Sequence, residues 1–459
     1  MNDKIDLVSV PEKSFWKLSV PLVIFYIFNT IYSIADIMWI SQIGVEETFA
    51  LGVSIPLVSL IFSLGLCIGQ GTNSIMSRFI GAGDNESAYN ALIHGILLSN
   101  ITWIICLLCM LFSKEILFYL DKTGSYLLVF DYMIPIVIFA YIFIFVNTLC
   151  ETLQAEGNSR FPSALLIATN ILNIILDPIF IFHLNLGLTG AAYATVISAL
   201  PAFLIIIYYY LSGRTKIPLS LNYFKFKPYI IVEIIKVGIP NFLNEAIWTF
   251  SALFINFILL LTTGTIGPVL YAVSYVIQNF MNTSVKGYGK GLMSVTGHLF
   301  GARKFDNLEK MFHYALKVSL ITMIIEIIFL IIFRNYIFQA FSITGMDNTI
   351  FWIVILGSIA LISFPFSMIS SRMLDGFGKS IYSLYLTLVK ITVQIIIIFA
   401  GYSISTSGYC VLIGIVVSEV LIAFAYYILL INLFKNFDEL YSKKDTVKTF
   451  NEKSTDEIT

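Results

Sequence analysis

Charged residues are scarce in this sequence, and the scarcity excludes most soluble proteins. Asp, Glu, Lys and Arg make up only 12% of the 459 residues, whereas 58% are hydrophobic and the mean hydropathy is +0.88. A soluble domain carries roughly 25% charged residues, so this composition indicates an integral membrane protein. The net charge is only −1 and no dense basic cluster is present, so we expect no nucleic-acid partner.

The sequence also lacks the motifs of several other function classes. The five cysteines all lie within apolar segments, which favours plain packing over a disulfide framework. No Walker loop is present, so ATP is not expected as the energy source. No Ser/His/Asp or HExxH arrangement supports an enzyme, and the four histidines lack metal-ligand spacing. We therefore expect neither enzymatic activity nor a cofactor.

Long apolar runs dominate what is present. Each has roughly 20 residues or more, the length that a helix needs to cross the bilayer core. The first of them is too long for the apolar region of a cleavable signal peptide. The chain is therefore predicted to be an all-α integral membrane protein with twelve transmembrane helices. The predicted spans lie near residues 15–40, 50–76, 91–112, 130–153, 161–183, 189–211, 229–261, 268–295, 314–333, 350–371, 381–401 and 409–434.

Lysine and arginine predict the orientation. Of the 27 such residues, all except Lys114, Lys122, Lys317, Arg334 and Lys390 fall in segments that share one side of the membrane with the two termini. Cytoplasmic segments of membrane proteins carry such an excess. We therefore expect a multi-pass protein of the inner (cytoplasmic) membrane, with both termini in the cytoplasm.

The chain contains an internal repeat. Three stretches recur at offsets of 220, 219 and 221 residues, which argues for duplication. Six spans precede the second copy, so the copies enter the membrane in the same direction and are expected to enclose a cavity between them. The matching stretches are "GQGTNSIMSRFIGAG" (69–83) with "GKGLMSVTGHLFGAR" (289–303), "KLSVP" ending at Pro21 with "KVGIP" ending at Pro240, and "QAEGNS" (154–159) with "DGFGKS" (375–380).

The repeat and the polar stretch between its copies predict the domain organisation. Each copy forms one lobe of six helices, and the connection is a cytoplasmic linker. The predicted segments are an N-terminal tail at 1–14, an N-terminal lobe at 15–211, the linker at 212–228, a C-terminal lobe at 229–434 and a C-terminal tail at 435–459.

An aspartate lies deep inside the fifth predicted span. In "LIATNILNIILDPIFIFHL", Asp177 follows Asn170 and Asn173 at the spacing that places all three on one helix face. A carboxylate at that depth costs at least about 2.5 kcal/mol, so we expect it to bind an ion or to have a protein partner. Pro178 follows directly and lacks an amide hydrogen, so it should free the carbonyl of Ile174 and bend the helix.

A second aspartate, Asp36, has similar polar company in the first span. Asn29 and Tyr32 precede it at the same spacing and share its helix face. Pro21, near the start of that span, should free the carbonyl of Lys17. Cation sites in membrane proteins use such freed carbonyl oxygens together with buried carboxylates.

Both aspartates occur in one copy of the repeat only. Their counterparts in the second copy are approximately Ile255 and Ile398. A purely structural acid would be equally useful in both copies, so the asymmetry favours a functional role. Asn147 in the fourth span and Thr195 in the sixth add an amide and a hydroxyl to the same half.

These residues together resemble the multidrug and toxic compound extrusion (MATE) transporters, in particular their prokaryotic branch. The marks are the spacing from Pro21 to Asp36 with "DIMWISQIG", then "RFIGAG", "NIILDP" and "HLFGAR", in order along essentially the whole chain. The resemblance implies two six-helix lobes in a V around a central cavity. It also implies antiport, in which an organic substrate leaves as sodium ions or protons enter.

The resemblance further implies a cation site in the N-terminal lobe. Some relatives also use a glutamate in span 7, where this chain has Glu245 nearer to the proline than in their motif. Carried over position by position, the main site falls on Tyr32 and Asp36 in span 1, Asn147 in span 4, Asn173 and Asp177 in span 5, and Thr195 in span 6.

The sequence leaves the coupling ion open between Na+ and H+. The oxygens of these side chains could replace the water around a sodium ion. Alternatively, two neighbouring carboxylates in a low dielectric resist double ionisation, so the pair could carry a proton. Both uses need the same residues.

The remaining acids within spans are expected to be structural. Glu326 and Glu419 have sparse polar company, and either could pair with Lys390 or meet water. Lys390 is predicted to be the only basic residue deep in a span.

We therefore predict a cation-coupled exporter of organic compounds. The 15% aromatic content suits flat or cationic molecules, and we expect a monomer whose partners are these substrates, the coupling cation and membrane lipids. The alternative within transport is a lipid-linked saccharide flippase, which should have a more cationic central cavity. A membrane enzyme would need a catalytic constellation that the sequence does not show.

Overall fold

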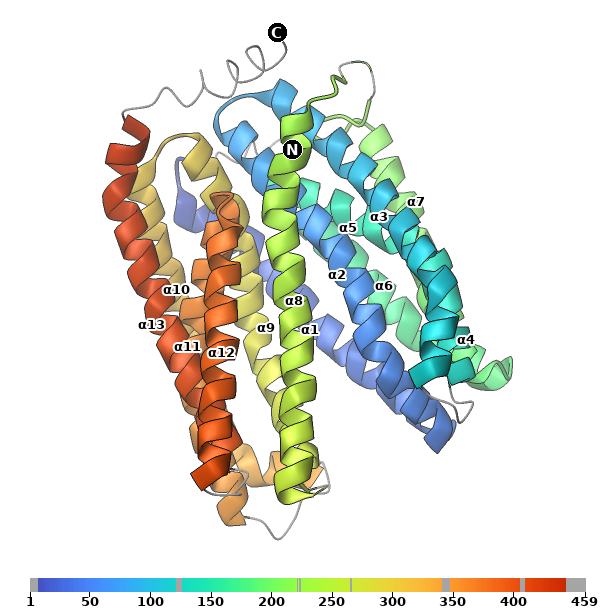
Figure 1. Cartoon of the computed structure of the whole chain (residues 1–459). Coiled ribbons are helices and arrows are strands. Elements are labelled where there is room, and N and C mark those ends of the chain that lie inside the picture. Colours follow the sequence, from blue (N-terminus) through green and yellow to red (C-terminus); the bar gives the residue numbers. More distant parts are fainter. Residues whose placement is uncertain are drawn as a thin grey trace.

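The computed structural model describes residues 7–120, 126–220, 222, 224–264, 266–340, 347–404 and 409–442. Within these ranges the chain is built of helices without a strand (Figure 1), and all five cysteines are free thiols. The elements are α1 (Pro11–Ser41), α2 (Val45–Gly81), α3 (Asn85–Leu120), α4 (Tyr126–Ile138), α5 (Ala140–Ala155), α6 (Arg160–Pro178), the π-helical turn η1 (Ile179–His183), α7 (Gly187–Leu211), α8 (Pro228–Thr263), α9 (Ile266–Gly301), α10 (Phe305–Ala340), α11 (Asp347–Gly376), α12 (Ser380–Ile404) and α13 (Tyr409–Ser442).

The twelve predicted spans correspond to these helices in order. The fourth is divided into α4 and α5, which are bent by 49° relative to each other, and the fifth continues from α6 into η1. Ten described helices, or eleven spans if the bent pair is one, are long and apolar enough to cross a membrane. The twelfth is α9, which is more polar because it carries Lys286 and Lys290. It packs against α1, α2 and α11 and completes an arrangement of six helices per repeat.

Two helices extend beyond the predicted limits of the lobes. α1 begins at Pro11, inside the predicted tail 1–14, because proline is well tolerated in the first helical turn. α13 continues to Ser442, beyond the predicted end of the second lobe at residue 434. The predicted tails at 1–6 and 443–459, Lys122 and the side chain of Lys114 lie outside the described residues.

The internal repeat is visible in the backbone geometry. α2 ends at Gly81 and α9 at Gly301, and both are followed by a residue in the left-handed region, Gly83 (φ 79°) and Arg303 (φ 56°). At each end the next amide reaches back to the helix, Asp84 N to Phe79 O at 2.9 Å and Lys304 N to Leu299 O at 2.9 Å. Gly157 and Gly378 close α5 and α11 in the same way. The two copies therefore share their helix caps as well as their sequence.

The first helix of each copy crosses to the opposite lobe. α1 packs mainly against α9, and α8 packs mainly against α2. Glycines permit the close approach, since a Cβ on Gly291 would lie 2.9 Å from Ser19 N and one on Gly71 would lie 2.2 Å from Ile234 O. Gly71 and Gly291 are equivalent in the repeat, so the two crossings are related by the same symmetry.

The two lobes are close at one end and separate at the other. Figure 1 shows α2–α7 and α9–α13 near each other at the end where α1 begins and α13 ends, and diverging toward the opposite end. We call these the closed end and the open end. The linker 212–228 lies at the closed end, where Glu156 Oε2 accepts the amide hydrogen of Lys216 at 2.8 Å and Oε1 accepts that of Ile217 at 3.3 Å.

Candidate functional site

The two polar helix faces predicted from sequence meet inside the N-terminal lobe. α1 packs against α6, and Asn170 Nδ2 donates to Asn29 Oδ1 at 3.5 Å. One turn further along α6, Asn173 is 2% exposed, and Asp177 is fully buried. The spacing on each helix therefore places its aspartate toward the other helix.

Asn173 connects Asp177 to α7. Its amide orientation follows from its neighbours: the nitrogen donates to Asp177 Oδ2 at 3.1 Å, and the oxygen accepts the amide hydrogen of Thr195 at 3.1 Å. The Thr195 hydroxyl donates to the carbonyl oxygen of Ala191 at 3.0 Å and lies within hydrogen-bonding reach of Tyr32 on α1. Five of the six predicted site residues, all except Asn147, thus form one cluster from α1, α6 and α7.

Asp36 supplies the free oxygen of this cluster. Its Oδ1 is buried and has no hydrogen-bond partner in the part of the chain that the structure describes. Asp36 interacts electrostatically with Asp177, with Tyr32 and with Tyr132 of α4. An unpaired buried carboxylate oxygen is costly, so the position suits a reversibly bound cation or proton. Tyr132 is a member that the sequence interpretation missed.

Pro178 changes the helix type directly after Asp177. α6 ends at the proline, and η1 continues with π-helical hydrogen bonding, including Leu184 N to Ile179 O at 2.9 Å. Single π-helical turns of this kind often occur at functional sites. A π turn thus lies where the sequence predicted a bend, and the bend itself stays a prediction.

Pro21 frees the carbonyl of Lys17, as predicted, but another residue uses it. The hydroxyl of Ser159, at the turn between α5 and α6, donates to Lys17 O at 3.3 Å. This freed carbonyl therefore holds two helices together and is not available to an ion.

Asn147 and Glu245 lie apart from the acid cluster in the contacts that the described residues make. Asn147 Nδ2 donates to Phe143 O of its own helix at 3.0 Å. Glu245 is exposed on α8 and interacts electrostatically with Tyr26, Lys286 and Arg372, which come from α1, α9 and α11. Its surroundings are the region between the lobes, and the roles of both residues stay predictions.

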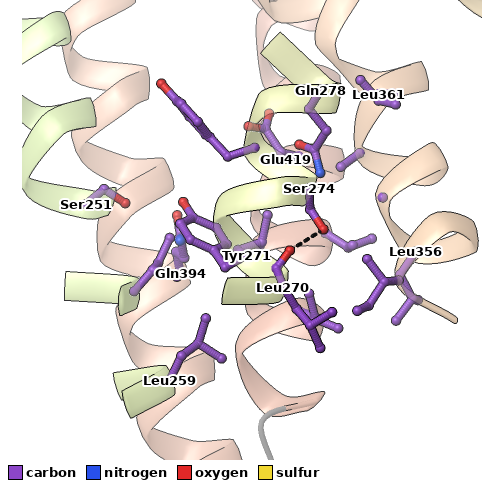
Figure 2. A pocket seen from close by; sticks show the side chains of 18 of the residues that line it. Ser251, Leu259, Leu270, Tyr271, Ser274, Gln278, Leu356, Leu361, Gln394 and Glu419 are labelled. Carbon is purple, nitrogen blue, oxygen red and sulfur yellow. Dashed lines mark hydrogen bonds between the residues drawn. The ribbon is translucent and has the colours of Figure 1, made fainter. Parts of the chain in front are cut away.

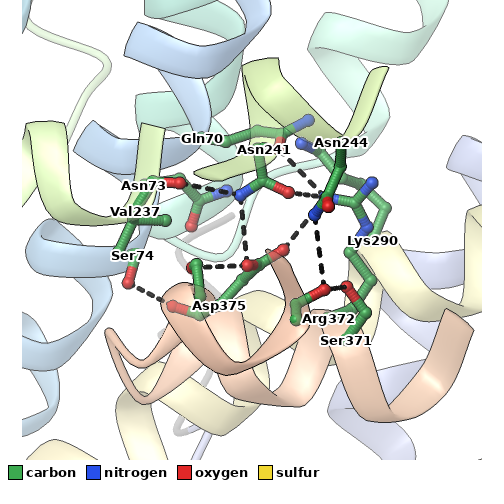
Figure 3. Close-up of polar contacts among 12 residues, drawn as sticks. Gln70, Asn73, Ser74, Val237, Asn241, Asn244, Lys290, Ser371, Arg372 and Asp375 are labelled. Atoms are coloured by element: carbon green, nitrogen blue, oxygen red, sulfur yellow. Dashed lines mark hydrogen bonds and ion pairs between the residues drawn. The ribbon is translucent and has the colours of Figure 1, made fainter. Parts of the chain in front are cut away.

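A buried polar network joins the two lobes at the closed end. Lys290 of α9 forms an ion pair with Glu151 of α5 at 2.5 Å, and Asn73 Nδ2 of α2 donates to Glu151 Oε2 at 2.9 Å. Arg372 of α11 donates to Gln70 Oε1 of α2 at 2.9 Å. Figure 3 shows how residues of α2, α8, α9 and α11 converge here.

Asp375 anchors the second part of this network. Its Oδ1 accepts hydrogen bonds from Asn241 at 3.1 Å and from Ser380 at 2.5 Å, and its Oδ2 pairs with Arg372 at 3.1 Å. Its backbone carbonyl accepts the hydroxyl hydrogen of Ser74 from the other lobe. Each buried charge therefore has an opposite partner.

The sequence interpretation missed this network, although the repeat contained its signal. Gln70 corresponds to Lys290 at an offset of 220, and Glu151 corresponds to Arg372 at an offset of 221. The contacts Gln70–Arg372 and Lys290–Glu151 are consequently the same contact made twice around the repeat axis. Aligning the polar residues of the two copies would have identified both pairs.

One interpretation of the basic residues is corrected. Lys390 is not the only base inside the bundle, because Lys290 is 4% exposed and Lys286 and Arg372 also lie between helices. Lys290 and Arg372 each pair with an acid, and Lys286 donates to the amide oxygen of Asn279.

The remaining ionisable residues within the predicted spans, Glu326, Lys390 and Glu419, lie in the C-terminal lobe. Lys390 pairs with Glu419, and its Nζ lies 4.1 Å from the centre of the Trp248 ring. Glu326 lies near Ser284, and its Oε2 is buried without a partner among the described residues. Ile255 and Ile398, the counterparts of the two aspartates, are buried in one apolar cluster. The C-terminal lobe thus has no copy of the acid cluster in its described part.

Comparison with known proteins agrees with this architecture. The MatE family model matches residues 21–179 and 240–400, which is more than half of the chain. The multidrug export protein MepA of Staphylococcus saprophyticus is 29% identical over 309 residues, a region covering 64% of this chain and 65% of MepA. The match therefore spans less than two thirds of that relative.

Solved structures match over nearly the whole length. One is the outward-facing conformation of a multidrug resistance MATE family transporter of the MOP superfamily, with a TM-score of 0.91, 26% identity and coverage of 96% of this chain and 99% of that chain. Another is a MOP superfamily transporter from Pyrococcus furiosus, with a TM-score of 0.90, 27% identity and coverage of 95% and 99%.

Proposed function

This chain belongs to the MatE family, a family of transporters and not of enzymes, and we propose that it is a secondary active antiporter that exports organic compounds in exchange for Na+ or H+. The acid cluster of the N-terminal lobe carries the proposal. It combines two carboxylates with an unpartnered oxygen, at a depth where a charge is retained only for a purpose.

The chemistry of the cluster suits a reversibly bound cation. Carboxylate, amide and hydroxyl oxygens are the ligands that a small hard cation prefers. Asp36 and Asp177 would hold a sodium ion together with Asn173, Thr195 and Tyr32, or would share a proton. In either case, binding neutralises charge between α1 and α6.

α1 provides a mechanical link from this cluster to the rest of the molecule. Asp36 lies in its second half beside α6, while its first half crosses α9 of the other lobe at Gly287 and Gly291. A change in charge at Asp36 therefore acts on a helix that also holds the lobes together. Such an element can bias a two-state transporter.

The excess of lysine and arginine near the closed end supports a cytoplasmic location of that end. In that orientation the conformation is open outward. The cation then enters the cluster from outside as substrate leaves. After the cation binds, the lobes close outside and separate inside. MepA is a multidrug export protein, and the aromatic content here suits flat or cationic organic substrates.

Dye flux in sealed proteoliposomes tests this proposal. A sodium gradient and a pH gradient are imposed separately on wild type, on Asp177→Asn and on the matched acid control Glu326→Gln. We expect one gradient to drive flux in wild type, no coupled flux in Asp177→Asn, and nearly normal flux in Glu326→Gln. Wild-type flux in Asp177→Asn would refute the role of the cluster. No flux of wild type under either gradient would refute antiport and favour a flippase.

A further inference from the structure

A pocket lies inside the C-terminal lobe, separate from the acid cluster. It has a volume of about 270 Å³ and is walled by α8, α9, α11, α12 and α13 (Figure 2). Its lining extends along α8 from Thr263, near the open end, to Trp248. Those residues are about 22 Å apart along a helix. The pocket is thus an elongated space that leads from the open end into the lobe.

The pocket contains a pair of opposite charges. Lys390 of α12 and Glu419 of α13 both line it, and they pair with each other. Each is less than 10% exposed. A buried ion pair seldom stabilises a protein more than well-packed apolar residues of the same volume. The position of Lys390 in the other copy is occupied by Thr169. Neither stability nor the repeat therefore accounts for this pair.

The walls around the pair are aromatic and amide-bearing. Trp248, Tyr271 and Tyr275 line the pocket, and Lys390 already covers the face of the Trp248 ring. Gln394 also borders it, and Asn282 contributes a buried Oδ1 with no partner among the described residues. Figure 2 shows Tyr271, Gln394 and Ser251 near one another in the pocket.

The charge pair restricts what can bind. A simple cation would pair with Glu419 and leave Lys390 buried without an anion, and a simple anion would do the reverse. A zwitterion whose ammonium and carboxylate are adjacent can insert into the pair and leave every charge with a partner. The volume is below the roughly 300–1,000 Å³ of pockets for drug-sized ligands, which favours a molecule about as large as an aromatic amino acid.

We propose that the C-terminal lobe holds an organic-ligand site, in which Lys390 binds the carboxylate and Glu419 binds the ammonium of an aromatic α-amino acid or similar zwitterion. Trp248, Tyr271 and Tyr275 contact its ring. The site goes beyond the antiport proposal, because binding at equilibrium needs neither a gradient nor the acid cluster.

Calorimetric titration of the full-length protein in lipid nanodiscs tests the site. The probes are L-tryptophan, tryptamine and indole-3-propionate, which share the ring and differ in charge. We expect L-tryptophan to bind at least tenfold more tightly than either singly charged probe. Equal affinity for L-tryptophan and tryptamine, or no measurable binding of L-tryptophan, would overturn the proposal without any variant.

Variants locate the binding. The double variant Lys390→Met/Glu419→Met removes both charges together, so neither is left buried alone. It should lose the preference for L-tryptophan over the other two probes. Asp177→Asn, in the other lobe, should bind L-tryptophan as wild type does even though its coupled flux is lost. Undiminished preference in the double variant would show that L-tryptophan binds elsewhere.

Discussion

The ion pair between Lys290 and Glu151 allows a direct test of how the lobes are held closed. Glu151→Gln preserves the size of the side chain and removes its charge. Breaking one side of a buried pair costs roughly 3–5 kcal/mol. Arg372 repels Lys290, and Asp375 attracts it less strongly, so these neighbours do not offset the loss of Glu151. The lower end of the range is used below as the minimum effect.

The cost of leaving Lys290 without Glu151 applies only to the present conformation, in which Lys290 is buried. The pair joins α5 of one lobe to α9 of the other, so a conformation in which the closed end separates exposes Lys290 to water and does not bear the cost. About 3 kcal/mol corresponds to a shift of roughly 150-fold, which would bring a 99:1 equilibrium near to equality. We therefore expect Glu151→Gln to populate a conformation in which the present open end is narrower.

Double electron–electron resonance measures this change. Spin labels are attached at Leu184 and Leu261, which are exposed near the open ends of the two lobes, after exposed Cys109 is replaced by serine. Wild type should give mainly a long distance between the labels. Glu151→Gln should add a second population at shorter distance.

Glu419→Gln is the matched control. It breaks a buried Lys–Glu pair of the same chemistry, but both partners belong to the C-terminal lobe. It should lower the thermal stability and leave the distance distribution unchanged. Wild-type distances in Glu151→Gln, together with a loss of thermal stability equal to that of Glu419→Gln, would contradict this prediction. The Lys290–Glu151 pair would then stabilise the fold without holding the lobes closed.

Three further changes test other parts of the structure. Tyr132→Phe should reduce coupled flux several-fold without loss of stability, since it removes one oxygen beside the two aspartates and keeps the ring; equal flux in liposomes would exclude a role for the phenol. Burial raises the pKa of Glu156 to about 7 from an ordinary 4.5, so the folded protein keeps a proton that the unfolded chain releases. Stability should therefore fall by up to about 3 kcal/mol as pH rises from 4.5 to 7, and Glu156→Gln should remove this slope in thermal unfolding. Gly71→Ala should lower the Tm, because the added Cβ forces α2 away from α8. Gly52→Ala is the control: its Cβ meets nothing within 4 Å, so the Tm should change only by the small amount expected of a surface substitution.

Much of the fold followed from one-dimensional patterns. Apolar runs of bilayer length predicted the helices, and the spacing of Asn29, Tyr32 and Asp36 predicted a polar face that the structure places against α6. Fold and family were predicted correctly from these features and the repeat. α1 and α13 extend beyond the predicted lobe limits, to Pro11 and Ser442, because a helix continues past the apolar segment when its polar residues tolerate helical geometry.

The sequence by itself thus determined which segments are helices, which face of the first and fifth spans is polar, and that Asp36 and Asp177 lie in the same lobe. These properties depend on helical periodicity and on the cost of burying polar groups. Only the tertiary structure decided that Tyr132 joins the acid cluster, that Lys290 meets Glu151, and that Lys390 and Glu419 share a pocket. Those contacts join helices that are far apart in the chain, and they depend on how each helix is rotated and on how closely its glycines let it approach the next.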